Sequence, residues 1–373
     1  MNSELSIFAA RLRDFIGFCG DESLKSLPAT ELQKHFDVEF NTMALVLFGL
    51  QFRNNAAYRR LCEARGILPD DLVHWSQIPA VPTAAFKELE MTSLSPQERT
   101  AVFHSSGTTE QRPSRHFHCE DSLVTYEASL WAALNYQLAV SDFKLAILTP
   151  PPAQTPHSSL VHMFEVVRQK LNQSPDLFFG QAKADGTWAL DFDAIMRTFN
   201  PSVVAHQPVL VLGTAFSFVH LMDFLAEKNL RLTLASESRV LETGGYKNRS
   251  RSMLKAELHA LITERLSVPA ENIICEYGMT ELSSQAYDTA HITPDNGRRF
   301  RFPPWARVQI ISPETGREVA DGETGLVRVC DLANVYSAMA IQTEDLAIRR
   351  GDGFELVGRA TAAEPRGCSL MNV

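Results

Sequence analysis

Strands and helices are predicted to alternate along the middle of the chain, and this pattern constrains the fold more than any other feature. Four short apolar runs, each bounded by proline, glycine or polar residues, predict strands at 144–148, 208–212, 239–242 and 272–276. Helical patterns follow the second and third runs, at 213–229 and 254–262. Strands that alternate with helices in this way usually form a parallel sheet covered by helices. We therefore expect an α/β protein.

The two ends of the chain have a different texture. Residues up to about Val73 read as mostly helical, and the apolar side chains of the first helix recur at helical spacing, at Leu5, Phe8, Leu12, Phe15 and Ile16. From about residue 305, short β runs alternate with turn residues, which predicts antiparallel hairpins. We expect one large domain over 1–345, β-rich from about 305, followed by a hinge and short tail over 346–373.

Composition excludes several classes of protein. The net charge of −9 gives no reason to expect nucleic-acid binding, although the basic stretches 247–251 and 298–301 leave open a docking patch for an acidic partner. No apolar run reaches the ~20 residues that a membrane span needs, and the N-terminus has no basic signal-peptide region. The six cysteines are scattered without metal-binding spacing, so we expect a reduced, cytoplasmic protein without zinc.

Three loops carry residues suited to binding a nucleotide. Hydroxyl groups and exposed N–H groups of 105–109 can cradle phosphate oxygens, although the GxxxxGK[ST] pattern of P-loop enzymes is missing. The turn at 244–247 brings backbone close to a flat ring, on which Tyr246 can stack. In 277–281, the Glu281 carboxylate suits Mg²⁺ bound to nucleotide phosphates. Each loop alone is more often an ordinary turn, and their combination and order favour a site.

Specific motifs resemble those of a known superfamily. "SSGTT" at 105–109, "YGMTE" at 277–281, "TED" at 343–345 and "GR" at 358–359 match, in order, the adenylate-forming enzymes. These include acyl-CoA synthetases, peptide-synthetase adenylation domains and luciferases. Longer segments such as "VPTAAFKELE", "CEYGMTELSSQAYD" and the terminal "RGCSL" resemble the acyl-protein synthetase family of bacterial bioluminescence operons. The resemblance covers essentially the whole chain.

The resemblance implies the large-domain fold of these enzymes, with the C-terminal domain reduced to a short tail. It also implies ATP, Mg²⁺ and a set of binding residues. Glu281 would hold Mg²⁺, Thr280 would touch the α-phosphate, Asp345 would bind the ribose and Arg359 would lie at the hinge. The other residues expected to bind ATP or AMP are Ser105, Ser106, Gly107, Thr108, Thr109, Gly244, Gly245, Tyr246, Tyr277 and Gly278. For the acyl pocket we expect Phe216, His206 and Gly213.

The chain also departs from the larger relatives. Only 14 residues follow Arg359, since 373 − 359 = 14, and none of them is the lysine that orients the carboxylate in those enzymes. Lys247 and Lys87 are the available substitutes, of which we favour Lys247. Cys368, near the end of the chain, is the candidate acyl acceptor, because Arg366 would favour its thiolate. The competing interpretation is a chance cysteine on a frayed terminus.

These residues predict a ligase that converts a fatty or aryl acid to acyl-AMP and passes the acyl group to a thiol, which suits an activated carbonyl. The acceptor is expected to be Cys368, with onward transfer to an acyl-carrier protein, acyl reductase or acyltransferase. Coenzyme A or a phosphopantetheine thiol is the close alternative. A non-catalytic nucleotide-binding interaction module is the alternative from another class.

Overall fold

The structure is a computed structural model, and it describes residues 3–21, 28–105, 112–138, 142–184, 187–199, 207–244, 253–288 and 298–360. The described chain divides into two compact units. The first unit comprises residues 1–136, 279–286 and 302–356, and the second comprises 137–278, 287–301 and 357–373. We describe each unit by itself.

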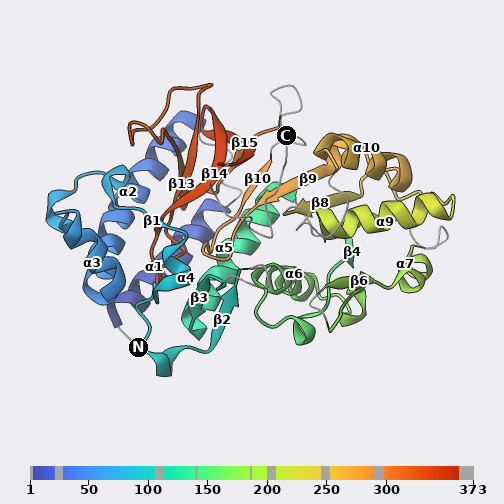
Figure 1. Ribbon diagram of the computed structural model, residues 1–373, viewed down its shortest axis with the longest axis horizontal. Coiled ribbons are helices and arrows are strands. Elements are labelled where there is room, and N and C mark those ends of the chain that lie inside the picture. Colours follow the sequence, from blue (N-terminus) through green and yellow to red (C-terminus); the bar gives the residue numbers. More distant parts are fainter. Residues whose placement is uncertain are drawn as a thin grey trace. The chain divides into compact units, whose positions relative to one another are not determined.

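The second unit contains the predicted parallel sheet, in the order β4-β7-β8-β9. All three neighbouring pairs are parallel. Helices α9 and α10 pack against each other, and α9 also packs on β7 and β8 (Figure 1). The sheet and these two helices span β4 Lys144–Ile147, β7 Val209–Thr214, β8 Arg239–Thr243, β9 Ile273–Tyr277, α9 Ala215–Glu227 and α10 Lys255–Leu266.

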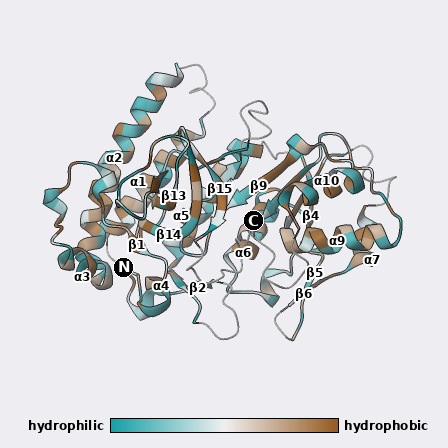
Figure 2. Cartoon of the chain, turned by 45° about the horizontal axis from the view of Figure 1, so that its top comes forward, coloured by the Kyte–Doolittle hydropathy of each residue, from teal (hydrophilic) through white to brown (hydrophobic). Residues whose placement is uncertain are grey.

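Nearly every side chain of these strands is buried, because helices and loops cover both faces of a parallel sheet. In Figure 2 the strand β9 is accordingly coloured as hydrophobic. The second unit also contains α6 Ser159–Lys170, α7 Phe192–Thr198, the hairpin of β5 Gly180–Ala182 with β6 Trp188–Leu190, and β11 Phe300–Arg301, which pairs with β10 Ala286–Asp288.

The first unit combines the N-terminal helices with an antiparallel sheet. Strands β12 and β13 pair from Ala306–Asp331 to Ile311–Leu326, and β14 pairs antiparallel with the other edge of β13. A short strand, β1, adds to β14 in parallel. The strands are β1 Val81–Pro82, β12 Ala306–Ile311, β13 Thr324–Asp331, β14 Ala340–Arg350 and β15 Gly353–Arg359, which ends in the second unit.

The helices of the first unit are α1 Ser3–Cys19, α2 Ala29–Asn54, α3 Ala56–Ala64, α4 Ala85–Glu88 and α5 Glu120–Leu138, and its hairpin joins β2 Ala101–His104 to β3 Arg115–His118. The five apolar side chains predicted to form one face of the first helix are all buried. The predicted helical N-terminal part and the predicted antiparallel hairpins are therefore confirmed. The predicted boundary between 345 and 346 stays a prediction, and residues 361–373 lie outside the described residues.

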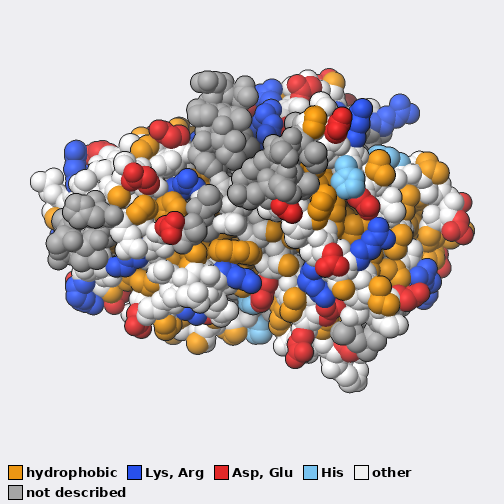
Figure 3. Space-filling model, turned by 180° about the vertical axis from the view of Figure 1, so that it is seen from behind, with side chains coloured by type: hydrophobic (Ala, Val, Ile, Leu, Met, Phe, Trp, Pro, Cys, Tyr) orange, Lys and Arg blue, Asp and Glu red, His pale blue; other side chains and the backbone are white. Residues whose placement is uncertain are grey.

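The described residues bear on the expectation about membrane spans and on the basic stretch 298–301. Among the described helices, none combines the length and apolar character needed to cross a bilayer. Lysine and arginine side chains are interspersed with acidic ones on the face drawn in Figure 3. In the basic stretch 298–301, Arg298 donates to Asp288 Oδ2 at 2.6 Å and to the Ala270 carbonyl oxygen at 2.7 Å. Internal contacts therefore explain this arginine without a docking partner.

Candidate functional site

Two of the candidate segments begin at one edge of the parallel sheet. The register pairs Thr214 of β7 with Thr243 of β8, and Thr243 with Glu276 of β9. The next residues along β8 and β9 are Gly244 and Tyr277, so both segments leave the sheet at its carboxyl edge. Ligands of open parallel sheets bind outside this edge. Gly244 has φ +73°, which glycine adopts without strain.

Two residues expected to line the acyl pocket, Gly213 and Phe216, lie in the second unit. A Cβ atom at Gly213 would lie 3.1 Å from Leu148 Cβ and 3.1 Å from Phe218 Cε2, so close packing favours glycine there. Phe216 is half-buried and its ring lies 4.4 Å from that of the exposed His220. A packing role was not foreseen for Gly213, and its role in acyl binding stays a prediction.

The segment that carries Thr280 and Glu281 is held in the first unit by side chains from distant parts of the chain. His116 Nδ1 lies 2.9 Å from the Thr280 carbonyl oxygen. Because a carbonyl oxygen only accepts, Nδ1 must carry the proton. Burial lowers the pKa of His116 to about 4, so the ring is neutral at physiological pH and keeps this tautomer. Asn334 Nδ2 donates to the Glu281 carbonyl oxygen at 2.9 Å.

Asp331, at the end of β13, fixes the residues that follow Glu281. Its carboxylate accepts hydrogen bonds from the backbone N–H groups of Ser283 and Ser284, at 2.9 and 2.8 Å, and from the Ser284 hydroxyl at 2.7 Å. It also accepts from the backbone N–H of Ala333 at 3.0 Å. Asp331 is fully buried, so these four donors replace the water that the carboxylate loses on folding. The loop after Glu281 is therefore positioned by one buried side chain.

A second layer supports Asn334. Gln51 of α2 donates to the carbonyl oxygens of Asn334 and Val335, and its own side-chain oxygen accepts from the Met339 N–H. All of these groups are buried. The supporting roles of His116, Asp331, Asn334 and Gln51 were not predicted from the sequence. The sequence does show polar residues inside otherwise apolar segments, which indicates that they are buried. It does not show which groups they contact.

The Glu281 carboxylate itself fits a cation. Its side chain is buried, with 2% of the residue exposed, and no hydrogen bond or ion pair from the described residues reaches its carboxylate. A buried carboxylate is costly unless it is paired or bound to a metal ion. This observation agrees with the chemistry expected of Glu281, whose role as an Mg²⁺ ligand stays a prediction.

Ser105 lies at the open end of the β2–β3 hairpin. Its backbone N–H donates to the Ser114 carbonyl oxygen at 3.1 Å, and its hydroxyl oxygen accepts from the Ser114 N–H at 2.8 Å. The hydroxyl can still donate to another group. The structure therefore gives Ser105 a role in closing the base of the predicted phosphate loop.

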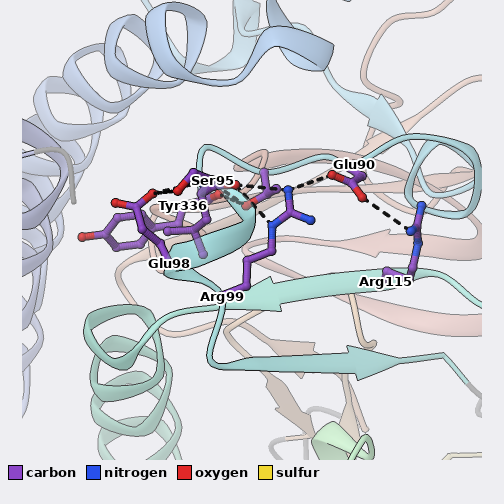
Figure 4. A network of polar contacts seen from close by, with 8 residues as sticks. Glu90, Ser95, Glu98, Arg99, Arg115 and Tyr336 are labelled. Carbon is purple, nitrogen blue, oxygen red and sulfur yellow. Dashed lines mark hydrogen bonds and ion pairs between the residues drawn. The ribbon is translucent and has the colours of Figure 1, made fainter.

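The two arginines after the predicted phosphate loop are placed beside acidic groups. Arg115 Nη1 lies 3.7 Å from Glu90, which also accepts from Arg99 at 2.7 Å (Figure 4). Arg112 Nη1 lies 3.8 Å from Glu88. The hydrogen bond from Arg99 is the main reason that the pKa of Glu90 is lowered. Exposed pairs of this kind are weak, so Arg112 remains available to an anionic ligand.

Asp345 and Arg359 lie on the last two strands. Asp345 is fully buried on β14, and its N–H donates to the Thr343 hydroxyl at 3.1 Å. Arg359 is the last residue of β15 and is half-buried. Their predicted roles at the ribose and the hinge stay predictions. The other candidates lie outside the described residues: Ser106, Gly107, Thr108, Thr109, His206, Gly245, Tyr246, Lys247 and Cys368.

A buried carboxyl that the sequence analysis did not single out lies at the sheet edge. The Thr243 hydroxyl donates to Glu276 Oε2, and burial is the main cause that raises the pKa of Glu276 to about 7. The Thr243 hydrogen bond opposes this shift, and the nearby Glu242 adds to it. Glu276 therefore changes charge near neutral pH, immediately before Tyr277.

We expect the stability of the protein to depend on this carboxyl. The folded pKa lies above the ordinary value of 4.5, so folding is favoured while Glu276 is protonated, and this contribution is lost as the pH rises from about 4.5 through about 7. Glu276→Gln should remove the loss, so its stability relative to wild type should increase by about 3 kcal/mol between pH 4 and pH 8. Urea unfolding at both pH values measures the difference. If the difference in unfolding free energy between the two proteins is the same at pH 4 and pH 8, Glu276 does not titrate in this range.

The comparisons with known proteins agree with this geometry. Residues 24–372 match the family described as "Acyl-protein synthetase, LuxE". The chain belongs to this family. It is 22% identical over 340 residues to the long-chain-fatty-acid–luciferin-component ligase of Aliivibrio fischeri, covering 87% of this chain and 85% of the relative. It is 24% identical over 333 residues to the protein of the same name from Vibrio harveyi, covering 86% and 83%.

The fold is similar to that of a 2-hydroxyisobutyryl-CoA ligase. One structure of that enzyme, with 2-HIB-AMP, covers 88% of this chain at a TM-score of 0.63 and 15% identity, and the chain spans only 65% of its length. Another, with 2-HIB-AMP and CoA, covers 90% of this chain and 69% of that chain at a TM-score of 0.64 and 14% identity. Similarity at this level concerns the fold, and it confirms the predicted α/β class.

The family assignment confirms the predicted enzyme class. The protein is a ligase that uses ATP to convert a carboxylic acid to acyl-AMP and transfers the acyl group to a thiol. The alternative of a non-catalytic nucleotide-binding module therefore does not hold. The identity of the acid and of the thiol is a separate question.

Proposed function

We propose that the acid is a long-chain fatty acid and that the acceptor thiol is Cys368 of the protein itself. The observation that carries this proposal is the family match, which runs to residue 372 and so includes Cys368 in its "RGCSL" context. The names of the two curated relatives support a long-chain fatty acid as substrate. From Cys368 the acyl group would pass to a partner protein, such as an acyl reductase, an acyltransferase or an acyl-carrier protein.

The described cysteines favour an acceptor elsewhere in the chain. Burial raises the pKa of the Cys19 thiol to about 12 and that of Cys62 to about 11. It also raises the pKa of Cys275 and Cys330 well above the ordinary value. A thiol is nucleophilic as the thiolate, so these four groups are poor acyl acceptors at neutral pH. All five described cysteines are free.

In the first half-reaction, the fatty acid carboxylate attacks the α-phosphate of ATP and pyrophosphate leaves. Glu281 would hold Mg²⁺, which supplies positive charge to the phosphate oxygens when bound. The Thr280 hydroxyl would donate a hydrogen bond to the α-phosphate, and His116 would keep Thr280 in place through its carbonyl oxygen. Asp345 would accept hydrogen bonds from the ribose hydroxyls, and Lys247 would orient the fatty acid carboxylate.

In the second half-reaction, the Cys368 thiolate attacks the carbonyl carbon of acyl-AMP. A C–S bond forms, the C–O bond to the phosphate breaks, and AMP leaves. The product is a thioester, from which a partner protein can take the acyl group. The predicted cytoplasmic location is compatible with free thiols of this kind and stays a prediction.

Measuring the intact mass of the protein after incubation with ATP, Mg²⁺ and a mixture of fatty and aryl acids tests both parts of the proposal. We expect a mass increase equal to one long-chain fatty acid minus one water, located by proteolysis on the peptide that contains Cys368. Acylation of added coenzyme A or of a phosphopantetheine carrier without any labelled protein would instead assign the acceptor to those thiols. An aryl adduct without a fatty one would overturn the substrate proposal.

A further inference from the structure

Three side chains with different metal-binding atoms converge in the second unit. Glu242 lies on β8, His259 on α10 and Cys275 on β9, three elements that are labelled in Figure 1. All three side chains are buried. The register of the sheet places Glu242 directly beside Cys275. Their ligand atoms lie within 4.8 Å of one another. None of the three has a role in the reaction proposed above.

The separations between the ligand atoms match those around a tetrahedral zinc ion. Cys275 Sγ lies 3.3 Å from Glu242 Oε2 and 3.7 Å from His259 Nε2, and His259 Nε2 lies 3.5 Å from Glu242 Oε2. Metal–ligand bonds of 2.0–2.3 Å at tetrahedral angles place neighbouring ligand atoms about 3.3–3.6 Å apart. The three atoms therefore surround a point from which one ion could reach all of them.

We propose that Glu242, His259 and Cys275 form a binding site for a divalent transition-metal ion of the zinc type. A thiolate, an imidazole and a carboxylate are the ligands that zinc takes in proteins, and three of them leave one position open. On binding, the Cys275 thiol loses its proton to solvent, a metal–sulfur bond forms, and neutral His259 coordinates through Nε2. The spacing of the cysteines in the sequence led to the expectation that the protein binds no zinc. Spacing does not reveal this site, because its three ligands come from three separate elements.

A positively charged side chain next to the site would compete with the metal ion. Lys255 Nζ lies 3.9 Å from Glu242 Oε2 and 5.3 Å from the centre of the Phe300 ring. Its side chain is 31% exposed, so it can turn toward solvent. A lysine ammonium and a metal ion repel each other, so Lys255 and the metal compete for Glu242.

Asp288 is the acidic residue that would offset part of the charge of the ion. Arg298 Nη1 lies 3.7 Å from Cys275 Sγ and is itself neutralised by Asp288, at 2.6 Å. Asp288 is 1% exposed, and its other oxygen, Oδ1, has no hydrogen-bond partner among the described residues. This oxygen could accept a hydrogen bond from a water molecule in the open coordination position.

The site would join the segments that lead into the nucleotide-binding loops. Gly244 follows Glu242 by two residues, and Tyr277 follows Cys275 by two. A metal ion bound to both strands and to α10 would fix the ends of β8 and β9. We therefore expect metal to stabilise the folded protein, since a ligand that binds only the native state raises its stability.

Titration of the chelator-treated full-length protein with Co²⁺ and Zn²⁺ tests the proposal without measuring activity. We expect one Co²⁺ per chain, with the visible absorption of a tetrahedral ion and a thiolate-to-cobalt charge-transfer band, both displaced by Zn²⁺. Cys275→Ser should lose the charge-transfer band, and His259→Gln should bind more weakly. Cys330→Ser, a buried cysteine in the first unit, is the matched control and should keep the spectrum. Lys255→Met, which removes the competing charge, should bind metal about 10-fold more tightly than wild type.

The Lys255→Met variant keeps the test valid if another variant misfolds. Its expected result is a gain of metal binding, which misfolding would not produce. If Cys275→Ser and Cys330→Ser give the same cobalt spectrum, the metal lies elsewhere and the proposal is wrong. The proposal is also overturned if folded wild-type and Lys255→Met proteins bind no metal. A failure of the acyl-transfer proposal would leave all of these results unchanged.

Discussion

Cys368→Ser should abolish the acyl label on the protein while acid-dependent release of pyrophosphate continues. A serine hydroxyl is a far weaker nucleophile than a thiol at neutral pH. The label on wild type should be a thioester that neutral hydroxylamine removes, and this signal should fall to background in the variant. Protein-bound radioactive fatty acid, measured with and without hydroxylamine, gives the result directly.

Cys19→Ser is the matched control for this experiment. Cys19 is the one described cysteine that is not fully buried, and burial nevertheless raises the pKa of its thiol to about 12. Its replacement should leave the label at the wild-type level. If the label survives Cys368→Ser, the acyl group resides on another residue and the assignment of Cys368 is wrong.

Asp331→Ala should be the most destabilising single substitution of those considered for the first unit. The change removes the acceptor of four hydrogen bonds and leaves three buried backbone N–H groups, of Ser283, Ser284 and Ala333, without it. An unsatisfied buried donor costs about 1–3 kcal/mol, so we expect a loss of about 3–5 kcal/mol in the free energy of unfolding. Urea denaturation measures this loss, and adenylation activity should fall with it because the loop after Glu281 loses its anchor.

Two further variants separate the hydrogen bonds from general effects. Asp331→Asn keeps one side-chain oxygen and should lose less stability than the alanine variant. Asp70→Ala removes an exposed aspartate and should change the stability by at most about 0.5 kcal/mol. A loss below about 1 kcal/mol for Asp331→Ala would mean that water replaces the carboxylate, and the loop would not depend on it.

The course of the chain was predictable where periodicity alone decides the structure. The four buried strands, their parallel arrangement, and helices α9 and α10 all follow from apolar runs and their spacing. The convergence of Gly244 and Tyr277 at one edge also follows, because parallel strands share the direction of their carboxyl ends.

The supporting contacts were not predictable in the same way. Asp331 lies 47 residues from Ser284 in the sequence, and His116 lies 164 residues from Thr280. Which side chains meet over such separations depends on strand register and on side-chain direction, and neither is encoded in a local pattern. The cluster of Glu242, His259 and Cys275 was missed for the same reason, since it combines two strands with a helix.

Acid-dependent formation of pyrophosphate is the decisive measurement for the activation of a carboxylic acid with ATP. The assay uses the full-length protein, ATP, Mg²⁺ and a panel of fatty acids of increasing chain length alongside aryl acids. We expect pyrophosphate release that requires the acid, rises with fatty acyl chain length and falls by about 100-fold or more in Glu281→Gln. Release that is equal with and without every acid in the panel, or absent throughout, would contradict it.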